Sequence, residues 1–180
     1  VFGEVLRLLR SRCPGVVPVV PVAPVIADTI RKGVADWPVR PVIVTDLQDK
    51  HDAFAAAGAA LTKSGTSTLE LALAGVPMAV TYRVNPVTAA IARRLIRVPY
   101  VAMVNLLAGH RLVPELLQER CRADLLADTI MRLLTDGHSG RMQKAGFREI
   151  IATLHGPQGD PTAAAADEIL DLLDVPASRA

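Results

Sequence analysis

Small polar and acidic residues gather in one short segment, which contains Ser64, Gly65, Thr66 and Glu70 in the run S-G-T-S-T-L-E. Glycine and small hydroxyl residues let a backbone approach a ligand closely, and the free N–H groups that open a helix can bind a phosphate. A carboxylate about one turn further along can accept hydrogen bonds from the paired hydroxyls of a ribose. The spacing therefore indicates a nucleotide site, with phosphate at residues 64–66 and ribose at Glu70.

The same segment also matches a purely structural pattern. Ser67 and Glu70 have the spacing of a capping box, in which Ser67 caps a helix and Glu70 bonds back to its amide. Capping boxes are common, so the local pattern by itself favours capping over ribose binding. One carboxylate cannot easily serve both roles, and the spacing leaves the two interpretations open.

Two later loops carry further candidate residues. Arg83, in the run T-Y-R-V-N-P, could pair with a phosphate or could be an ordinary solvated arginine. Asn105, in the run N-L-L-A-G-H-R, could bind a ligand or simply turn the chain. Residues 83–122 hold seven arginines and two glutamates, a net charge of +5, whereas the remainder sums to −3. This excess fits an anionic lipid or a phosphorylated acceptor, although a solvated helix face fits it equally well.

Several common site patterns are absent from the sequence. It contains neither G-x-G-x-x-G nor G-x-x-x-x-G-K-[ST], which removes the usual dinucleotide and P-loop interpretations. It has no Asp-x-Asp pair to hold a divalent metal against a diphosphate, and its four histidines lack the spacing of a metal site or a catalytic triad. We therefore expect no metal and no cofactor, with backbone amides and arginine neutralising any diphosphate.

Length and composition narrow the class of protein. The chain has 180 residues, of which 51% are hydrophobic, so one domain with a real core is expected and disorder is not. A formal net charge of +2 does not favour nucleic acid as a partner. Cys13 and Cys121 lie far apart without metal-ligand spacing, which predicts reduced thiols in a cytosolic protein. The longest apolar stretch, residues 16–27, contains three prolines and is too short to cross a bilayer.

Hydrophobic periodicity predicts short strands that alternate with helices. Such alternation with short connections implies a doubly wound α/β fold with a parallel sheet. Extra helices follow at the carboxyl-terminal end, and residues 175–180 are expected to be a frayed tail. The predicted strands are 16–20, 41–45, 59–63, 77–82 and 100–104, and the predicted helices are 1–12, 24–32, 48–57, 67–74, 86–97, 114–119, 122–134, 140–154 and 161–173.

Three blocks of the sequence carry a resemblance to a known family. They are S-G-T-x-x-L-E, Y-R-x-x-P and N-L-L-A-G-x-x-x-V-P-E-L-L-Q, within residues 64–86 and 92–121. In their order and spacing the chain resembles lipid-A-disaccharide synthase, a bacterial glycosyltransferase of the GT-B type. The resemblance implies transfer of 2,3-diacylglucosamine from its UDP donor to 2,3-diacylglucosamine 1-phosphate, which yields lipid A disaccharide 1-phosphate and UDP.

The resemblance also implies a domain organisation. Residues 1–174 would be the Rossmann-like, UDP-sugar-binding half of a two-domain enzyme, truncated at its start. The amino-terminal half, with acceptor groups and the catalytic base, and the P-G-S-R phosphate loop expected just before Val1 would be missing. We therefore expect no catalytic residue in this chain, and UDP binding without turnover.

The resemblance also implies partners, which are the UDP donor, a lipid acceptor at the membrane surface and the missing half. Nucleic acid is not expected, and a homo-oligomer is allowed. The implied location is cytoplasmic and peripheral, on the inner face of the inner membrane.

Carried over residue by residue, the family's nucleotide site falls on Ser64, Gly65, Thr66, Glu70 and Asn105. For Glu70 this implication reverses the preference for a capping role.

The resemblance also implies residues that contact either a phosphate or the acceptor. Arg83 and Arg111 are the candidates, whereas His110 stands where the family commonly has arginine. Two alternatives remain open: another GT-B enzyme acting on a UDP-sugar, such as a cell-wall N-acetylglucosaminyl transferase or a UDP-sugar 2-epimerase, and a non-catalytic α/β interaction module.

Overall fold

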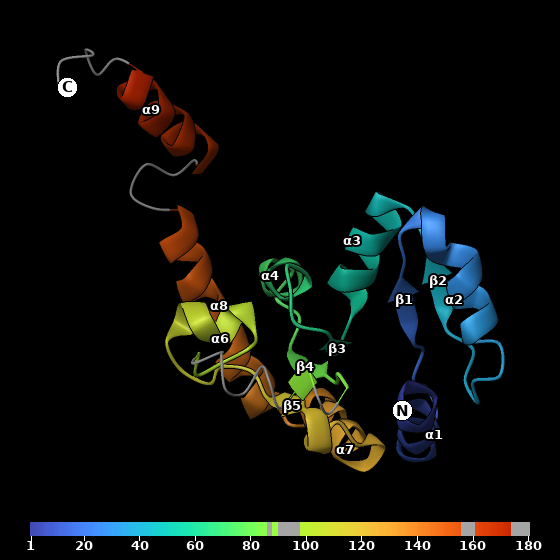
Figure 1. Ribbon diagram of the computed structural model, residues 1–180. Helices are drawn as coiled ribbons and strands as arrows, with labels where there is room; N and C mark the ends of the chain where they lie inside the picture. Colours follow the sequence, from blue (N-terminus) through green and yellow to red (C-terminus); the bar gives the residue numbers. More distant parts are fainter. Residues whose placement is uncertain (86–87, 90–97, 156–160, 174–180) are drawn as a thin grey trace.

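The computed structural model (Figure 1) describes residues 1–85, 88–89, 98–155 and 161–173. Its strands form two parallel sheets. In one, β1 (Val19–Pro21) pairs with β2 (Val42–Val44). In the other, β4 (Met78–Tyr82) lies between β3 (Ala60–Thr62) and β5 (Glu115–Leu117). The predicted α/β class with parallel strands is confirmed, and the arrangement agrees with a Rossmann-like half of a GT-B enzyme.

Strand β4 is the centre of the core, because helices cover both of its faces. Met78 and Val80 point into a cluster formed with α4 (Ser67–Leu73), α6 (Met103–Ala108) and α8 (Gly137–His155). Ala79 points the other way, into a cluster formed with α1 (Phe2–Arg12) and α7 (Ala123–Thr135). All three residues are fully buried. Such burial on both faces is what the continuous apolar run of this strand predicts.

A buried side chain from α8 supports the start of β4. Gln143 Oε1 accepts from the Met78 amide at 2.8 Å, and Gln143 Nε2 donates to the Met78 carbonyl at 3.1 Å. The glutamine therefore satisfies both backbone groups of a strand residue, as a neighbouring strand would. This contact ties the first residue of β4 to the helix that packs beneath it.

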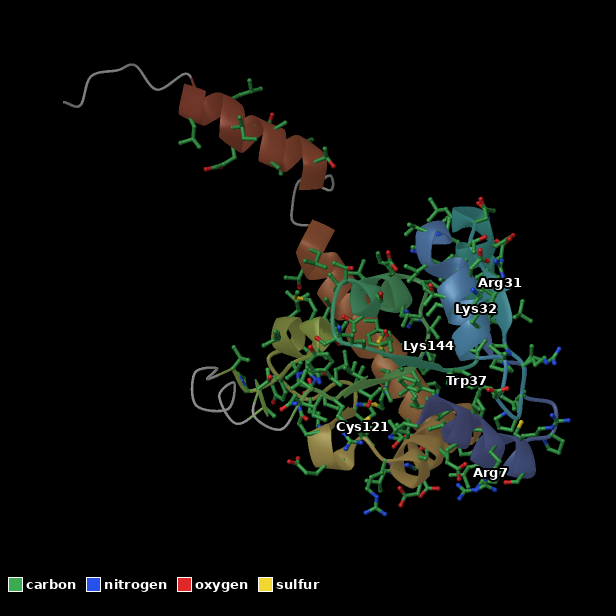
Figure 2. All side chains as sticks on the ribbon, turned by 45° about the vertical axis from the view of Figure 1, so that its right-hand side comes forward. Arg7, Arg31, Lys32, Trp37, Cys121 and Lys144 are labelled. Carbon is green, nitrogen blue, oxygen red and sulfur yellow. The ribbon has the colours of Figure 1, made fainter. Side chains whose placement is uncertain are left out.

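The β1–β2 unit, defined as residues 14–59, is packed much more thinly. It contains the 3₁₀ turn Pro24–Ile26, α2 (Ala27–Gly33) and α3 (Leu47–Ala56). Ala27 is its only buried residue. Trp37, labelled in Figure 2, lies against the start of α1, where a Cβ added at Gly3 would be 3.2 Å from the indole ring. Phe54 and Ala57, at the end of α3, are partly buried residues by which the unit reaches the core around β4.

Two sequence predictions of secondary structure are wrong. Residues 100–104 do not form a strand, because the chain bends at 101–102 and α6 begins at Met103. Residues 114–119 do not form a helix, since Glu115–Leu117 is the strand β5 and a 3₁₀ turn, Gln118–Arg120, follows it. The two errors have one origin. The backbone amides of Val101 and Ala102 bond to a carboxylate from β5 instead of to a strand, and β5 itself takes the place beside β4.

The remaining boundaries agree with prediction within a few residues. The first strand runs over Val19–Pro21 instead of the predicted 16–20 and begins directly after Pro18, which has no N–H to donate to a neighbouring strand. Helix α9 (Pro161–Leu173) lies apart from the other helices in both views (Figures 1 and 2). The predicted helix 86–97 falls mostly outside the described residues, although Thr88 and Ala89 are helical, and the tail 175–180 also lies outside them. Among the described helices, none combines the length and apolarity needed to cross a membrane.

Candidate nucleotide site

The turn after β3 has the backbone shape that its glycine permits. Gly65 has φ +146°, in the region that side chains disfavour, and an added Cβ there would meet open space. Thr68, buried in the first turn of α4, donates from Oγ1 to the Gly65 carbonyl at 2.8 Å. The buried Thr68 hydroxyl therefore stabilises the turn through the Gly65 carbonyl, while the space next to the Gly65 Cα stays open.

Glu70 does not form a capping box. Helix α4 begins at Ser67, its N-cap is Thr66, and no side chain caps it. The Glu70 carboxylate instead binds the ammonium of Lys50, with Nζ 3.1 Å from Oε1 and 3.1 Å from Oε2. The capping interpretation is thus wrong, because the carboxylate points across to α3 and not back along its own helix.

A cavity opens beside this ion pair. It has a volume of about 190 Å³ and lies between α3 and α4, lined by His51, Phe54, Glu70, Leu73 and Ala74. The Glu70 side chain is 43% exposed. The carboxylate therefore borders a space that a small ligand can enter from solvent.

The turn is also joined to the segment before α6. Ser64 Oγ donates to the Val101 carbonyl at 2.5 Å, across 37 residues of sequence. The Val101 amide in turn donates to the carboxylate of Glu115, at 3.1 and 3.2 Å from its two oxygens. Ser64 is thus linked through Val101 to β5, which sets the position of the turn relative to the sheet.

Glu115 is an important residue that the sequence analysis missed. The residue is 7% exposed, and its carboxylate accepts hydrogen bonds from the amides of Val101 and Ala102 and from Asn105 Nδ2. A buried carboxylate needs several donors because desolvation of an unpaired charge is costly. The available signal was an acidic residue inside the apolar run V-P-E-L-L, which would have been unusual for a solvated helix face.

Asn105 lies near the same network but faces the interior. It belongs to α6, not to a loop after a strand, and is fully buried. Its Nδ2 donates to the Val113 carbonyl at 2.9 Å and to Glu115 at 2.8 Å, while its Oδ1 accepts from the Val113 amide at 2.8 Å. The side-chain amide therefore joins α6 to the residues that lead into β5.

The two arginine candidates, Arg83 and Arg111, lie at the surface, outside the buried network. Arg83 is exposed just after β4. Arg111 is exposed between α6 and β5, and its Nη2 donates to the Glu115 carbonyl at 3.4 Å. His110 lies beside it with Nδ1 2.9 Å from the Ala108 carbonyl. Within the described residues, neither arginine forms an ion pair.

Comparison with known proteins identifies relatives over nearly the whole chain. The family model described as lipid-A-disaccharide synthetase matches residues 2–169. A lipid-A-disaccharide synthase of Gluconobacter oxydans is 61% identical over 179 residues, which cover 99% of this chain and 43% of the relative. Another, of Granulibacter bethesdensis, is 55% identical over 184 residues, covering 96% and 47%. A third, of Rhodospirillum centenum, is 43% identical over 172 residues, covering 96% and 43%.

The chain thus spans somewhat less than half the length of these curated relatives. The matched region includes the turn after β3, Glu70 and the Asn105–Glu115 network, all within the family model. The chain belongs to the lipid-A-disaccharide synthetase family.

Proposed function

We propose that this chain supplies the donor-binding half of an enzyme of lipid A biosynthesis. The reaction moves 2,3-diacylglucosamine from UDP to 2,3-diacylglucosamine 1-phosphate, with release of UDP. The observation that carries the proposal is the Glu70 carboxylate, which borders an open cavity one turn after a glycine turn in a chain of this family.

In this proposal the nucleotide lies along the turn and the first turn of α4. The backbone of Ser64, Gly65 and Thr66 binds the diphosphate, which the unusual φ of Gly65 and the open space above it support. Glu70 accepts hydrogen bonds from the ribose hydroxyls, because a carboxylate can bind two neighbouring hydroxyls at once.

Asn105 has a supporting role in the same site. Its amide is fully engaged with Val113 and Glu115, so we assign it the task of holding α6, and with it Val101, against the turn. Val101 in turn accepts from Ser64. Loss of Asn105 would therefore act on nucleotide binding through the position of the turn.

The chemistry requires stabilisation of a leaving group. Cleavage of the donor's anomeric C–O bond places negative charge on UDP, and amides and guanidinium groups aimed at the diphosphate favour that charge in the transition state over the ground state. Arg83 and Arg111 are the exposed cations proposed for this task or for binding the acceptor's phosphate.

The acceptor hydroxyl also needs a base and a closed cleft. We assign both to the part of the enzyme that corresponds to the remaining length of the relatives. Accordingly, the chain alone should bind UDP without turning over.

Both substrates of the proposed reaction carry acyl chains, so the enzyme would work at a membrane surface. We place it on the cytoplasmic side of the bacterial inner membrane as a peripheral protein. The net charge of +5 over residues 83–122 supports this, since anionic headgroups attract clustered arginines.

The test uses the full-length protein that carries this chain. Diacylated UDP-glucosamine and diacylglucosamine 1-phosphate should yield a disaccharide 1-phosphate and UDP. Glu70→Gln should weaken UDP binding about tenfold or more, since hydrogen bonds to a charged group are among the stronger ones. Glu149→Gln, an exposed position on α8, is the matched control and should bind UDP normally.

Two outcomes would contradict the proposal. Formation of a different product, a cell-wall glycoside or an epimerised UDP-sugar, would assign the chain to another class of UDP-sugar enzyme. Unchanged UDP affinity in Glu70→Gln would remove Glu70 from the ribose site.

A further inference from the structure

We propose that Lys50 controls access to the Glu70 carboxylate. In the ligand-free protein its ammonium occupies both carboxylate oxygens, and nucleotide binding exchanges this ion pair for hydrogen bonds from the ribose. The inference rests on the proposed function, because it uses Glu70 as the ribose-binding residue.

The geometry of the ion pair places the Lys50 ammonium where the ribose hydroxyls would bind Glu70. Lys50 Nζ lies 3.1 Å from Oε1 and 3.1 Å from Oε2 of Glu70, so the ammonium sits between the two oxygens. A ribose presents two neighbouring hydroxyls, and a carboxylate receives such a pair best with one oxygen for each hydroxyl. The ammonium and the ribose therefore require the same place on the carboxylate.

The position of Lys50 is set by its own helix. Asp46 caps α3, with its Oδ1 accepting from the amides of Gln48 at 2.7 Å and Asp49 at 3.3 Å. Lys50 follows in the first turn, and its amide bonds to the Asp46 carbonyl at 3.1 Å. The cap therefore fixes the direction in which the lysine side chain leaves α3 toward Glu70.

Lys50 has other favourable surroundings besides the Glu70 carboxylate. Its Nζ lies 5.7 Å from the centroid of the Phe54 ring, one turn further along α3, and its side chain remains 23% exposed. An aromatic face and solvent can both stabilise a cation. Release of the ammonium would thus not leave a buried, unpaired charge.

The partial exposure of the pair makes the exchange reversible. A fully buried ion pair is strongly disrupted by loss of one partner, whereas pairs near the surface contribute little to stability. The adjoining cavity of about 190 Å³ gives a ligand room to reach Glu70. Lys50 should therefore lower ribose affinity by a few-fold without blocking it.

The experiment titrates the full-length protein with neutral nucleosides, so that attraction between Lys50 and phosphate does not contribute. Lys50→Met keeps the length of the side chain and removes its charge. We expect this variant to bind uridine about two- to fivefold more tightly, as relief of a partly exposed ion pair implies. Binding of 2′,3′-dideoxyuridine, which lacks both ribose hydroxyls, should not change.

Salt provides a readout that a merely structural lysine would not affect. Added salt screens the Lys50–Glu70 attraction, so uridine affinity should rise with ionic strength in the wild type. This rise should vanish in Lys50→Met and persist in Lys50→Arg, which retains the charge. Lys32→Met is the matched control, because Lys32 lies exposed on α2 in the same unit, labelled in Figure 2.

The outcomes separate this inference from the proposed function. If the wild type binds UDP but Lys50→Met behaves like Lys32→Met, or binds uridine more weakly, the competition is overturned while the donor site stands. If the wild type binds neither uridine nor UDP, both proposals fall.

Discussion

The two parallel sheets of this molecule are both built from short strands but differ greatly in burial. In the β3–β5 sheet, Val80 on the central strand is fully buried between two layers of helices. In the β1–β2 unit, Val19 and Val42 on paired strands are 39% and 50% exposed. The more β-branched strands, Val19–Pro21 and Val42–Val44, are thus the more exposed ones, and only the sheet covered on both faces gains a core.

The proposed nucleotide site lies on the border between these regions. Glu70 belongs to α4, which packs on the β3–β5 sheet, and Lys50 belongs to α3 of the thinly packed unit. Regions with few buried contacts open more readily than a core does. The carboxylate thus stands on a helix with three buried residues, and the lysine on a helix with none.

The largest effect is expected from the buried network of the β3–β5 sheet. Glu115→Ala removes the acceptor for Val101, Ala102 and Asn105, and unsatisfied buried donors cost roughly 1–3 kcal/mol each. We expect a loss of about 3 kcal/mol or more in the free energy of unfolding, measured by urea denaturation. Glu149→Ala, at an exposed site, should change it little. A small loss in Glu115→Ala would show that water replaces the carboxylate.

A matched pair of valine substitutions tests the contrast in burial directly. Val80→Ala creates a cavity in the core and should lower the free energy of unfolding by roughly 2 kcal/mol. Val42→Ala, at a half-exposed site, should cost less than about 1 kcal/mol. Equal losses would mean that the β1–β2 unit is covered in solution and that the contrast does not hold.

The smallest effect concerns the acidic N-caps of the two regions. At the start of α8, Asp136 accepts from the Ser139 hydroxyl and from the amides of His138 and Ser139, and these bonds, the hydroxyl first, lower its pKa from the ordinary 3.8. A lowered folded-state pKa stabilises the protein above the ordinary value, and this contribution is lost as the pH falls through the folded-state value. Asp136→Asn should therefore lower the Tm at neutral pH.

The pH dependence supplies the check on this cap. The difference in Tm between the wild type and Asp136→Asn should shrink as the pH falls below about 4. Asp46→Asn makes the corresponding change at the cap of α3 in the thinly packed unit. A difference for Asp136→Asn that is constant with pH would rule out ionisation as the origin of the effect.

Sequence patterns predicted well those elements whose periodicity is local. The helix that begins at Ser67 and the strand that ends at Tyr82 lie where apolar spacing and the following glycine or polar residue indicate. The patterns failed over residues 100–104 and 114–119, which both lie at a proline, Pro99 in one case and Pro114 in the other. There the structure depends on Glu115, since a single side chain accepts the hydrogen bonds that a strand would otherwise receive.

The sequence by itself determined the alternation of strands and helices, the glycine turn at residue 65 and the family blocks, because each depends on neighbouring residues. Only the tertiary structure decided that Glu70 pairs with a lysine 20 residues away and that Asn105 is turned inward. The physical reason is that a carboxylate or an amide takes the partners that folding brings to it. Those partners come from other elements, and no local spacing encodes them.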